Sequence, residues 1–201
     1  MTPPRQADSD EYTVDIRDHI LMMEAIMKDR ELHTTISRIV HLIVRSLRDR
    51  GMVLLFGCGG SAADAQHIAA EFVNKMRVVR PPLAALALTT DTSVLTAISN
   101  DDTFDHVFRR QVEALATQHD VVIGISTSGQ SPSVLQGLEA GRACGAATVL
   151  FTGGWQRDYT GIADCVIRVP STSTPRIQEA HITLAHIICT HVEREFLHGP
   201  D

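Results

Sequence analysis

Residues 55–75 read LFGCGGSAADAQHIAAEFVNK, and this is the most informative stretch of the chain. An apolar run at 52–56 ends in a glycine loop, and the loop opens into a helix at Ser61. That helix carries His67 and Glu71, which are four residues apart and therefore share a face. A glycine loop at a helix N-terminus is typical of phosphate binding, and a histidine–glutamate pair can move protons or hold a divalent metal. The stretch therefore indicates chemistry on a phosphorylated small molecule.

Short apolar runs alternate with helical stretches on the C-terminal side of this segment. The runs at 83–88, 120–126, 147–153 and 165–170 join 52–56 as expected strands. Besides the helix from Ser61, helices are expected at 12–29, 31–49, 92–98, 103–117, 131–144 and 176–195, with Ser131 as an N-cap. Solid apolar strands separated by helices indicate a parallel sheet covered on both faces. We expect a three-layer, doubly wound α/β fold with its ligand at the carboxyl ends of five parallel strands.

The N-terminal part of the chain is expected to be a separate element. We interpret residues 1–10 as a disordered tail, 11–50 as a pair of helices that covers the core or forms a subunit interface, and 51–201 as one structural unit. The total of 201 residues suits one domain with a helical extension. With 44% hydrophobic and only 4% aromatic residues, the core should be aliphatic.

Charge and cysteine usage limit the classes of function. The net charge of −6 argues against broad attraction to nucleic acid or to an anionic membrane, although a helix N-terminus can still bind phosphate. The four cysteines form no C-x-x-C pair and are interpreted as reduced thiols in a cytoplasmic protein. The first residues do not resemble a signal peptide, and no apolar stretch is long enough for a membrane span.

The glycine loop at 57–61 has two other interpretations. It fits the dinucleotide pattern G-x-G-x-x-A through Ala62, but that pattern needs an acidic residue about 20 positions on, and Asp91 lies about 30 on. The loop also suits a simple tight turn. The second loop, STSGQS at 126–131, again joins a strand to a helix and offers four hydroxyls, which suits a phosphate monoester. Alone it also fits a serine-rich capping loop.

The final helix supplies further polar groups. Gln178 and His186 lie about 80° apart on a helical wheel, so both can face one site. His181 and His191 are interpreted as structural histidines of an apolar helix. The pair of His67 and Glu71 also fits an ordinary surface pair, but its helix begins at the phosphate loop.

Together these motifs resemble the phosphoheptose isomerases of the sugar isomerase (SIS) domain superfamily. The matching segments are GGSAADAQHIAAE (59–71), RPPLAALALTTDTSVLTAISND (80–101), ISTSGQSPSVL (125–135) and RIQEAHITLAHI (176–187). The resemblance implies a flavodoxin-like SIS fold and an aldose–ketose isomerase that converts sedoheptulose 7-phosphate to D-glycero-D-manno-heptose 7-phosphate. It also implies a cytoplasmic homotetramer with sites at subunit interfaces, and no nucleic-acid or membrane partner.

The resemblance also implies roles for individual residues. Glu71 and His186 would be the catalytic acid/base pair, and Asp101 would lie near the sugar as a further catalytic and substrate-binding group. One zinc ion per subunit would be held by His67, Glu71, Gln178 and His186. Substrate binding would involve Gly59, Gly60, Ser61, Ser126, Thr127, Ser128, Ser131 and Gln178.

Four positions depart from the family pattern. Cys58 and Gln130 stand where asparagine is usual, Lys75 where arginine is frequent, and Pro175 where a small or acidic residue is usual. They leave open a specialised isomerase of another heptose or octose phosphate. A non-catalytic SIS protein, either initiator-associating or a regulator, is the alternative of a different class. The presence of Glu71 and His186 favours the enzyme, and no DNA-binding helix-turn-helix precedes the domain.

Overall fold

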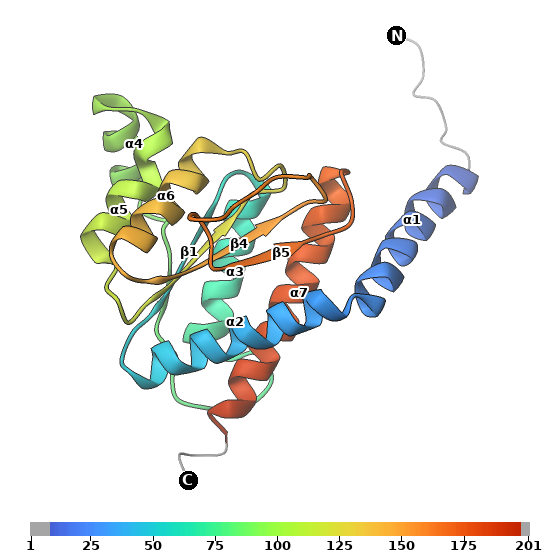
Figure 1. Ribbon diagram of the computed structural model, residues 1–201, viewed down its shortest axis with the longest axis horizontal. Helices are drawn as coiled ribbons and strands as arrows, with labels where there is room; N and C mark the ends of the chain where they lie inside the picture. The colour runs from blue at the N-terminus through green and yellow to red at the C-terminus, as the bar shows by residue number, and fades with distance from the viewer. Residues whose placement is uncertain (1–8, 198–201) are drawn as a thin grey trace.

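Five parallel strands form one sheet in the order β2-β1-β3-β4-β5 (Figure 1). The strands are β1 (Val53–Gly57), β2 (Ala85–Ala87), β3 (Val121–Ile125), β4 (Ala147–Thr152) and β5 (Cys165–Arg168). The structure is a computed structural model that describes residues 9–197. This strand order is the doubly wound, flavodoxin-like arrangement, so the predicted fold class is confirmed.

Seven α-helices and one 3₁₀ turn surround or extend this sheet among the described residues. They are α1 (Ser9–Lys28), α2 (Arg30–Arg48), α3 (Gly60–Val73), α4 (Thr92–Asp101), η1 (Phe104–His106), α5 (Val107–Leu115), α6 (Pro132–Ala143) and α7 (Thr174–Glu195). The expected tail at 1–10 overlaps the first two residues of α1, and residues 1–8 lie outside the described part.

Several predicted elements differ in detail from the structure. The short helix expected at 92–98 continues to Asp101. The expected helix at 103–117 is a 3₁₀ turn followed by α5, because the Thr103 hydroxyl caps the turn by accepting a bond from the Asp105 N–H, 3.3 Å away. The strand expected at 83–88 pairs only over Ala85–Ala87, at the sheet edge. Ser131 is the N-cap of α6 as predicted, but its side chain makes no capping bond.

The hydrophobic side chains of β1, β3, β4 and β5 alternate between two hydrophobic layers. Leu55, Ile123 and Phe151 pack with residues of α2, α3 and α7 on one face of the sheet. Leu54 and Val122 pack with residues of α5 and α6 on the other face. The core is mainly aliphatic, as expected, although its largest fully buried side chains are four phenylalanines: Phe56, Phe72, Phe108 and Phe151.

The two N-terminal helices behave differently. Helix α2 buries Ile36, Ile39 and Ile43 in the same hydrophobic layer as α3 and α7. Helix α1 projects from the body of the molecule (Figure 1) and buries only Met22 and Ile26 among its described side chains. No helix in residues 9–197 is both long enough and apolar enough to cross a bilayer.

Candidate active site

Two loops meet at the carboxyl ends of the neighbouring strands β1 and β3. Gly57 at the end of β1 is in register with Ile125 at the end of β3. The glycine loop at 57–61 and the serine loop at 126–131 therefore leave the same edge of the sheet next to each other. In the strand order 2-1-3, this edge is the switch point at which doubly wound proteins bind ligands.

The glycine loop turns sharply into α3. Gly59 has a φ of 60°, in the left-handed region that favours glycine, and the helix begins one residue earlier than expected, at Gly60. Ser61 is 3% exposed and lies in the first turn of the helix. The first turn of α3 follows directly after Cys58, which contacts Ser131 of the serine loop, and the free N–H groups of such a turn can bind an anion.

Tyr159 stabilises the conformation of the serine loop through a hydrogen bond. The buried Tyr159 hydroxyl donates to the Gly129 carbonyl oxygen over 3.3 Å. Within the loop, the hydroxyl oxygens of Ser126 and Ser128 are 3.5 Å apart, and the Gln130 N–H donates to Ser128 Oγ at 3.2 Å. These contacts hold several hydroxyls in one turn, which suits recognition of an oxyanion.

A thiol joins the two loops. Cys58 Sγ lies 3.5 Å from Ser133 Oγ and 4.0 Å from Ser131 Oγ, and the two serine oxygens are 3.1 Å apart. Cys58 is exposed, whereas Ser133 is buried. Cys58, one of the positions expected to depart from the family pattern, therefore contacts Ser131, one of the expected substrate-binding residues.

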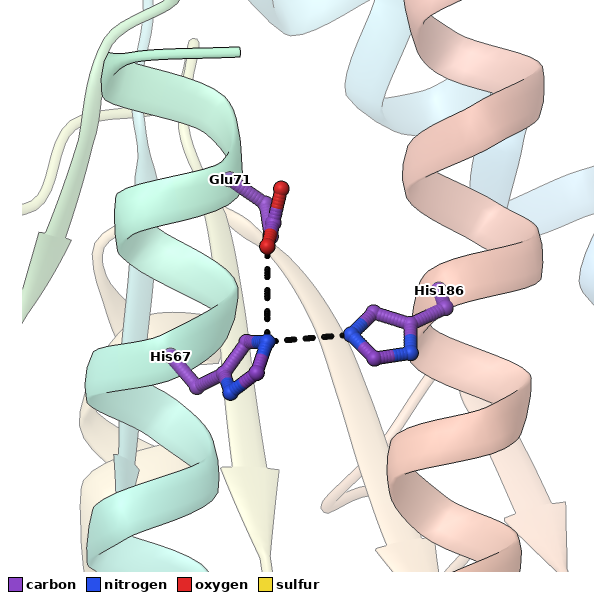
Figure 2. Close-up of side chains that lie close together, drawn as sticks. All are labelled: His67, Glu71 and His186. Atoms are coloured by element: carbon purple, nitrogen blue, oxygen red, sulfur yellow. Dashed lines mark hydrogen bonds and ion pairs between the residues drawn. The ribbon is translucent and has the colours of Figure 1, made fainter. Parts of the chain in front are cut away.

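Helices α3 and α7 bring His67, Glu71 and His186 into one cluster (Figure 2). His67 Nε2 lies 3.4 Å from Glu71 Oε1 and 3.0 Å from His186 Nε2. One ligand atom from each residue lies within 4.8 Å of the other two. His67 is half exposed and Glu71 is 22% exposed, so the cluster can be reached from solvent.

The donor set of this cluster suits a metal. Two imidazole nitrogens and one carboxylate oxygen are the ligand types of catalytic zinc sites, which keep a further position open. The same groups are suited to proton transfer. The cluster can therefore hold a divalent cation or exchange protons with a bound substrate.

Gln178, the fourth expected zinc ligand, is placed differently from the three residues of the cluster. A Cβ atom added to Gly60 would contact the Gln178 carboxamide, so this side chain covers the start of α3. Among residues 9–197, Gln178 has no hydrogen bond to His67, Glu71 or His186. Its position links the phosphate loop with α7.

Asp101 is not brought to the cluster within this chain. It is the last residue of α4, it is exposed, and it accepts a bond from Asn100 Nδ2 at 2.7 Å. Helix α4 lies across the molecule from α7 (Figure 1).

Thr127 lies in the serine loop with Ser126 and Ser128, and its carbonyl oxygen accepts a hydrogen bond from the Gly153 N–H.

Several residues near the site were not identified from sequence. Asp64 lies one turn before His67, and burial raises the pKa of its carboxyl while the nearby His67 lowers it. Its i,i+3 spacing from His67 was the available signal. Arg80 and Glu193, a buried ion pair behind the cluster, gave no sequence signal because 113 positions separate them.

Two other titratable side chains of α7 are structural. His181 is 1% exposed, and burial lowers its pKa to about 4, while a bond to the Thr152 carbonyl acts in the opposite direction. This agrees with the prediction that His181 belongs to the core. The same prediction for His191 is wrong, because its side chain is exposed. Burial raises the pKa of the Cys189 thiol to about 12, so this thiol is not reactive at neutral pH.

Comparisons of sequence and of structure with known proteins agree with one another. The SIS domain family model matches residues 18–153. Phosphoheptose isomerase from Geobacter sp. (strain M21) is 49% identical over 191 residues, covering 94% of this chain and 98% of that protein. The structure of phosphoheptose isomerase from Neisseria gonorrhoeae is 38% identical with a TM-score of 0.83, covering 91% and 98%. That of a Francisella tularensis phosphoheptose isomerase is 30% identical with a TM-score of 0.87, covering 92% and 97%.

Proposed function

The chain belongs to the phosphoheptose isomerase family of SIS domain proteins, and we propose that it converts sedoheptulose 7-phosphate to D-glycero-D-manno-heptose 7-phosphate in heptose biosynthesis. It is thus an aldose–ketose isomerase. The observation that carries the proposal is the cluster of His67, Glu71 and His186 on two facing helices, of which α3 begins at the glycine loop.

The proposed phosphate site lies at the glycine and serine loops. Ser61, Ser126, Thr127, Ser128 and Ser131 supply hydroxyl donors, and Gly59 and Gly60 let the backbone approach the anion. Binding the remote phosphate supplies energy that positions the reacting end of the sugar.

The proposed proton transfers use the two helices that face each other. Isomerisation removes a proton from the carbon beside a carbonyl and returns one to the neighbouring carbon. The Glu71 carboxylate takes the carbon-bound proton, and the His186 imidazole exchanges a proton with the sugar oxygen. The 3.0 Å contact with His67 orients the His186 ring for this role.

We also propose that His67, Glu71, Gln178 and His186 hold one zinc ion per subunit. The ion would supply positive charge that stabilises an enediolate. The donor set supports this proposal, with Gln178 moving from its place over Gly60. A carboxylate that ligates zinc is not a free base in the same state, so chelator titration with metal analysis separates the two roles of Glu71.

The turnover experiment follows the aldose product from sedoheptulose 7-phosphate, with and without added zinc. Glu71→Gln and His186→Asn should lose activity, whereas Glu113→Gln and His41→Asn, which change exposed side chains of α5 and α2, should keep it. Absence of wild-type turnover under both conditions would refute the substrate. A panel of octulose phosphates then tests whether Cys58 and Gln130 have shifted the specificity.

We further propose a cytoplasmic homotetramer whose sites use residues of two subunits. Four free cysteines support the location. The projecting α1 supports the assembly, because a second copy of the chain would cover its exposed apolar side chains: Val14, Ile16, Ile20, Leu21 and Met27. The distance of Asp101 from the cluster supports a role for it in a neighbouring subunit's site.

Subunit mixing tests this shared site. Mixed oligomers of Asp101→Asn and Glu71→Gln subunits should regain activity, since some sites then combine intact residues from both chains. Glu71→Gln mixed with His186→Asn is the matched control, because these two residues meet within one chain and no intact site can form. Equal behaviour of the two mixtures would count against the shared site, and sedimentation measures the assembly directly.

A further inference from the structure

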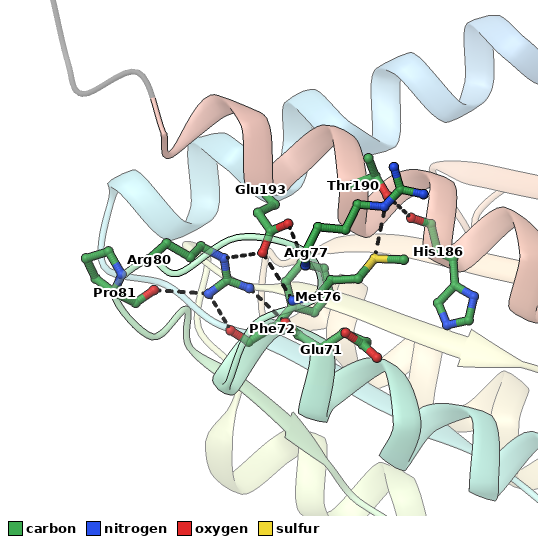
Figure 3. A network of polar contacts seen from close by, with 9 residues as sticks. All are labelled: Glu71, Phe72, Met76, Arg77, Arg80, Pro81, His186, Thr190 and Glu193. Atoms are coloured by element: carbon green, nitrogen blue, oxygen red, sulfur yellow. Dashed lines mark hydrogen bonds and ion pairs between the residues drawn. The ribbon is translucent and has the colours of Figure 1, made fainter.

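Arg80 and Glu193 form an ion pair that is almost completely buried behind the candidate active site (Figure 3). Arg80 Nε lies 3.2 Å from Glu193 Oε1, and the side chains are 2% and 3% exposed. Replacing a buried ion pair with apolar residues is often neutral or even stabilising. The pair is therefore weak evidence for a role in stability, and its contacts show what else it does.

Arg80 binds the C-terminal end of α3, the helix that carries His67 and Glu71. Its guanidinium donates to the Glu71 carbonyl at 2.7 Å and to the Phe72 carbonyl at 2.9 Å. The last carbonyls of a helix have no partner within the helix, so these bonds fix the final turn of α3. One of the two carbonyls belongs to Glu71 itself.

Glu193 binds the segment after α3 and is itself part of α7. Its carboxylate accepts bonds from the N–H groups of Met76 and Arg77, both at 3.1 Å. It lies seven residues after His186, two helical turns along the same face. Thr190 adds a second connection, since its hydroxyl contacts Met76 Sδ at 3.5 Å and donates to the His186 carbonyl at 2.8 Å.

We infer that Arg80 and Glu193 are positioning residues that set the separation of α3 and α7, and through it the approach of Glu71 and His67 to His186. The inference rests on the proposed function of that cluster. Catalytic groups must be held to within about 0.5 Å, and a misplacement of about 1 Å can lower a rate a hundredfold. Arg80 touches the backbone of Glu71 but no reacting group, so it acts through that residue.

Arg80→Lys is the sharpest test, because it keeps the charge opposite Glu193 and removes the forked bonds to α3. Crystal structures of wild type and variant measure the distance from His67 Nε2 to His186 Nε2, which is expected to change by about 0.5 Å or more. We expect kcat to fall about tenfold to a hundredfold with KM within about twofold, because the phosphate loops lie at the other end of α3. Arg48→Lys is the control, since its partner Glu195 is also on α7 but both side chains are half exposed.

A second variant changes the other partner of the ion pair. Glu193→Gln keeps the shape of the side chain and removes its charge, and it should show the same split between kcat and KM. An unchanged histidine distance with unchanged kcat in a folded variant of either kind would overturn the inference. Failure of wild type to isomerise the heptose phosphate would refute the proposed substrate instead, and the distance measurement would still decide the role of the pair.

Discussion

The Nε2 atoms of His67 and His186 lie 3.0 Å apart, although 119 positions separate the two residues in the sequence. With Glu71 Oε1 at 3.4 Å from His67, they form a donor set for zinc. We predict that His67→Ala lowers zinc affinity at least about a hundredfold, because loss of even an outer-shell partner costs tenfold to a hundredfold. Competition with a chromophoric chelator measures the affinity. His41→Ala, on the exposed face of α2, should bind zinc like wild type.

Removing single hydroxyls from the serine loop should weaken phosphate recognition. A hydrogen bond to a charged group contributes about 1.5–3 kcal/mol, so Ser126→Ala and Ser128→Ala should each raise KM about tenfold to a hundredfold. Their kcat should change less, because neither residue belongs to the histidine cluster. Steady-state kinetics tests this expectation. Thr34→Ala removes an exposed hydroxyl of α2 and serves as control; an equal rise in its KM would contradict the assignment.

A methyl group at position 60 should act on Gln178. A Cβ there would collide with the Gln178 carboxamide, a side chain that can move aside, so Gly60→Ala should fold. We predict that it changes zinc affinity in the same direction as Gln178→Ala, and that the double variant is no worse than the more severe single variant. Chelator competition on the three proteins measures this coupling. Additive losses would show that the two positions act independently.

Buried His181 should make the protein less stable in mild acid. Its pKa is lowered to about 4 in the folded state, so between about pH 6.5 and pH 4 the unfolded chain binds a proton that the folded chain does not. Its contribution is fully present above pH 6.5 and falls by up to about 3 kcal/mol as the pH drops to 4. Urea unfolding at pH 7 and pH 5 should show a smaller pH difference in His181→Gln. An equal difference would exclude His181 as the cause.

The sequence predicted the fold more completely than the site. Solid apolar strands such as Val121–Ile125 need cover on both faces, so the doubly wound sheet followed from them. The split of the expected helix at 103–117 into η1 and α5 was not predictable, because the helical spacing of its apolar residues continues without interruption from η1 into α5. His67 and Glu71 share one helix, so their proximity was predictable. The approach of His186 depends on how α7 packs against α3.

Gln178 shows why a helical wheel alone does not predict whether two residues of a helix meet at one site. It lies about 80° from His186 in projection, but eight residues also separate the two by about 12 Å along α7. The structure accordingly has its carboxamide over Gly60. The Arg80–Glu193 ion pair could not be predicted either, because local sequence patterns carry no information about contacts between residues so distant in sequence.

The contact between Tyr159 and Gly129 limits how this enzyme could acquire a new substrate. Gly129 has a φ of 63°, and any side chain there would collide with the tyrosine hydroxyl, so two independent constraints keep this position as glycine. Exposed Gln130 is under neither constraint, and exposed Cys58 contacts Ser131 of the same loop. Evolution, or a directed library, would therefore be least restricted at positions 58 and 130 of the two loops, which are also two of the positions expected from the sequence to depart from the family pattern.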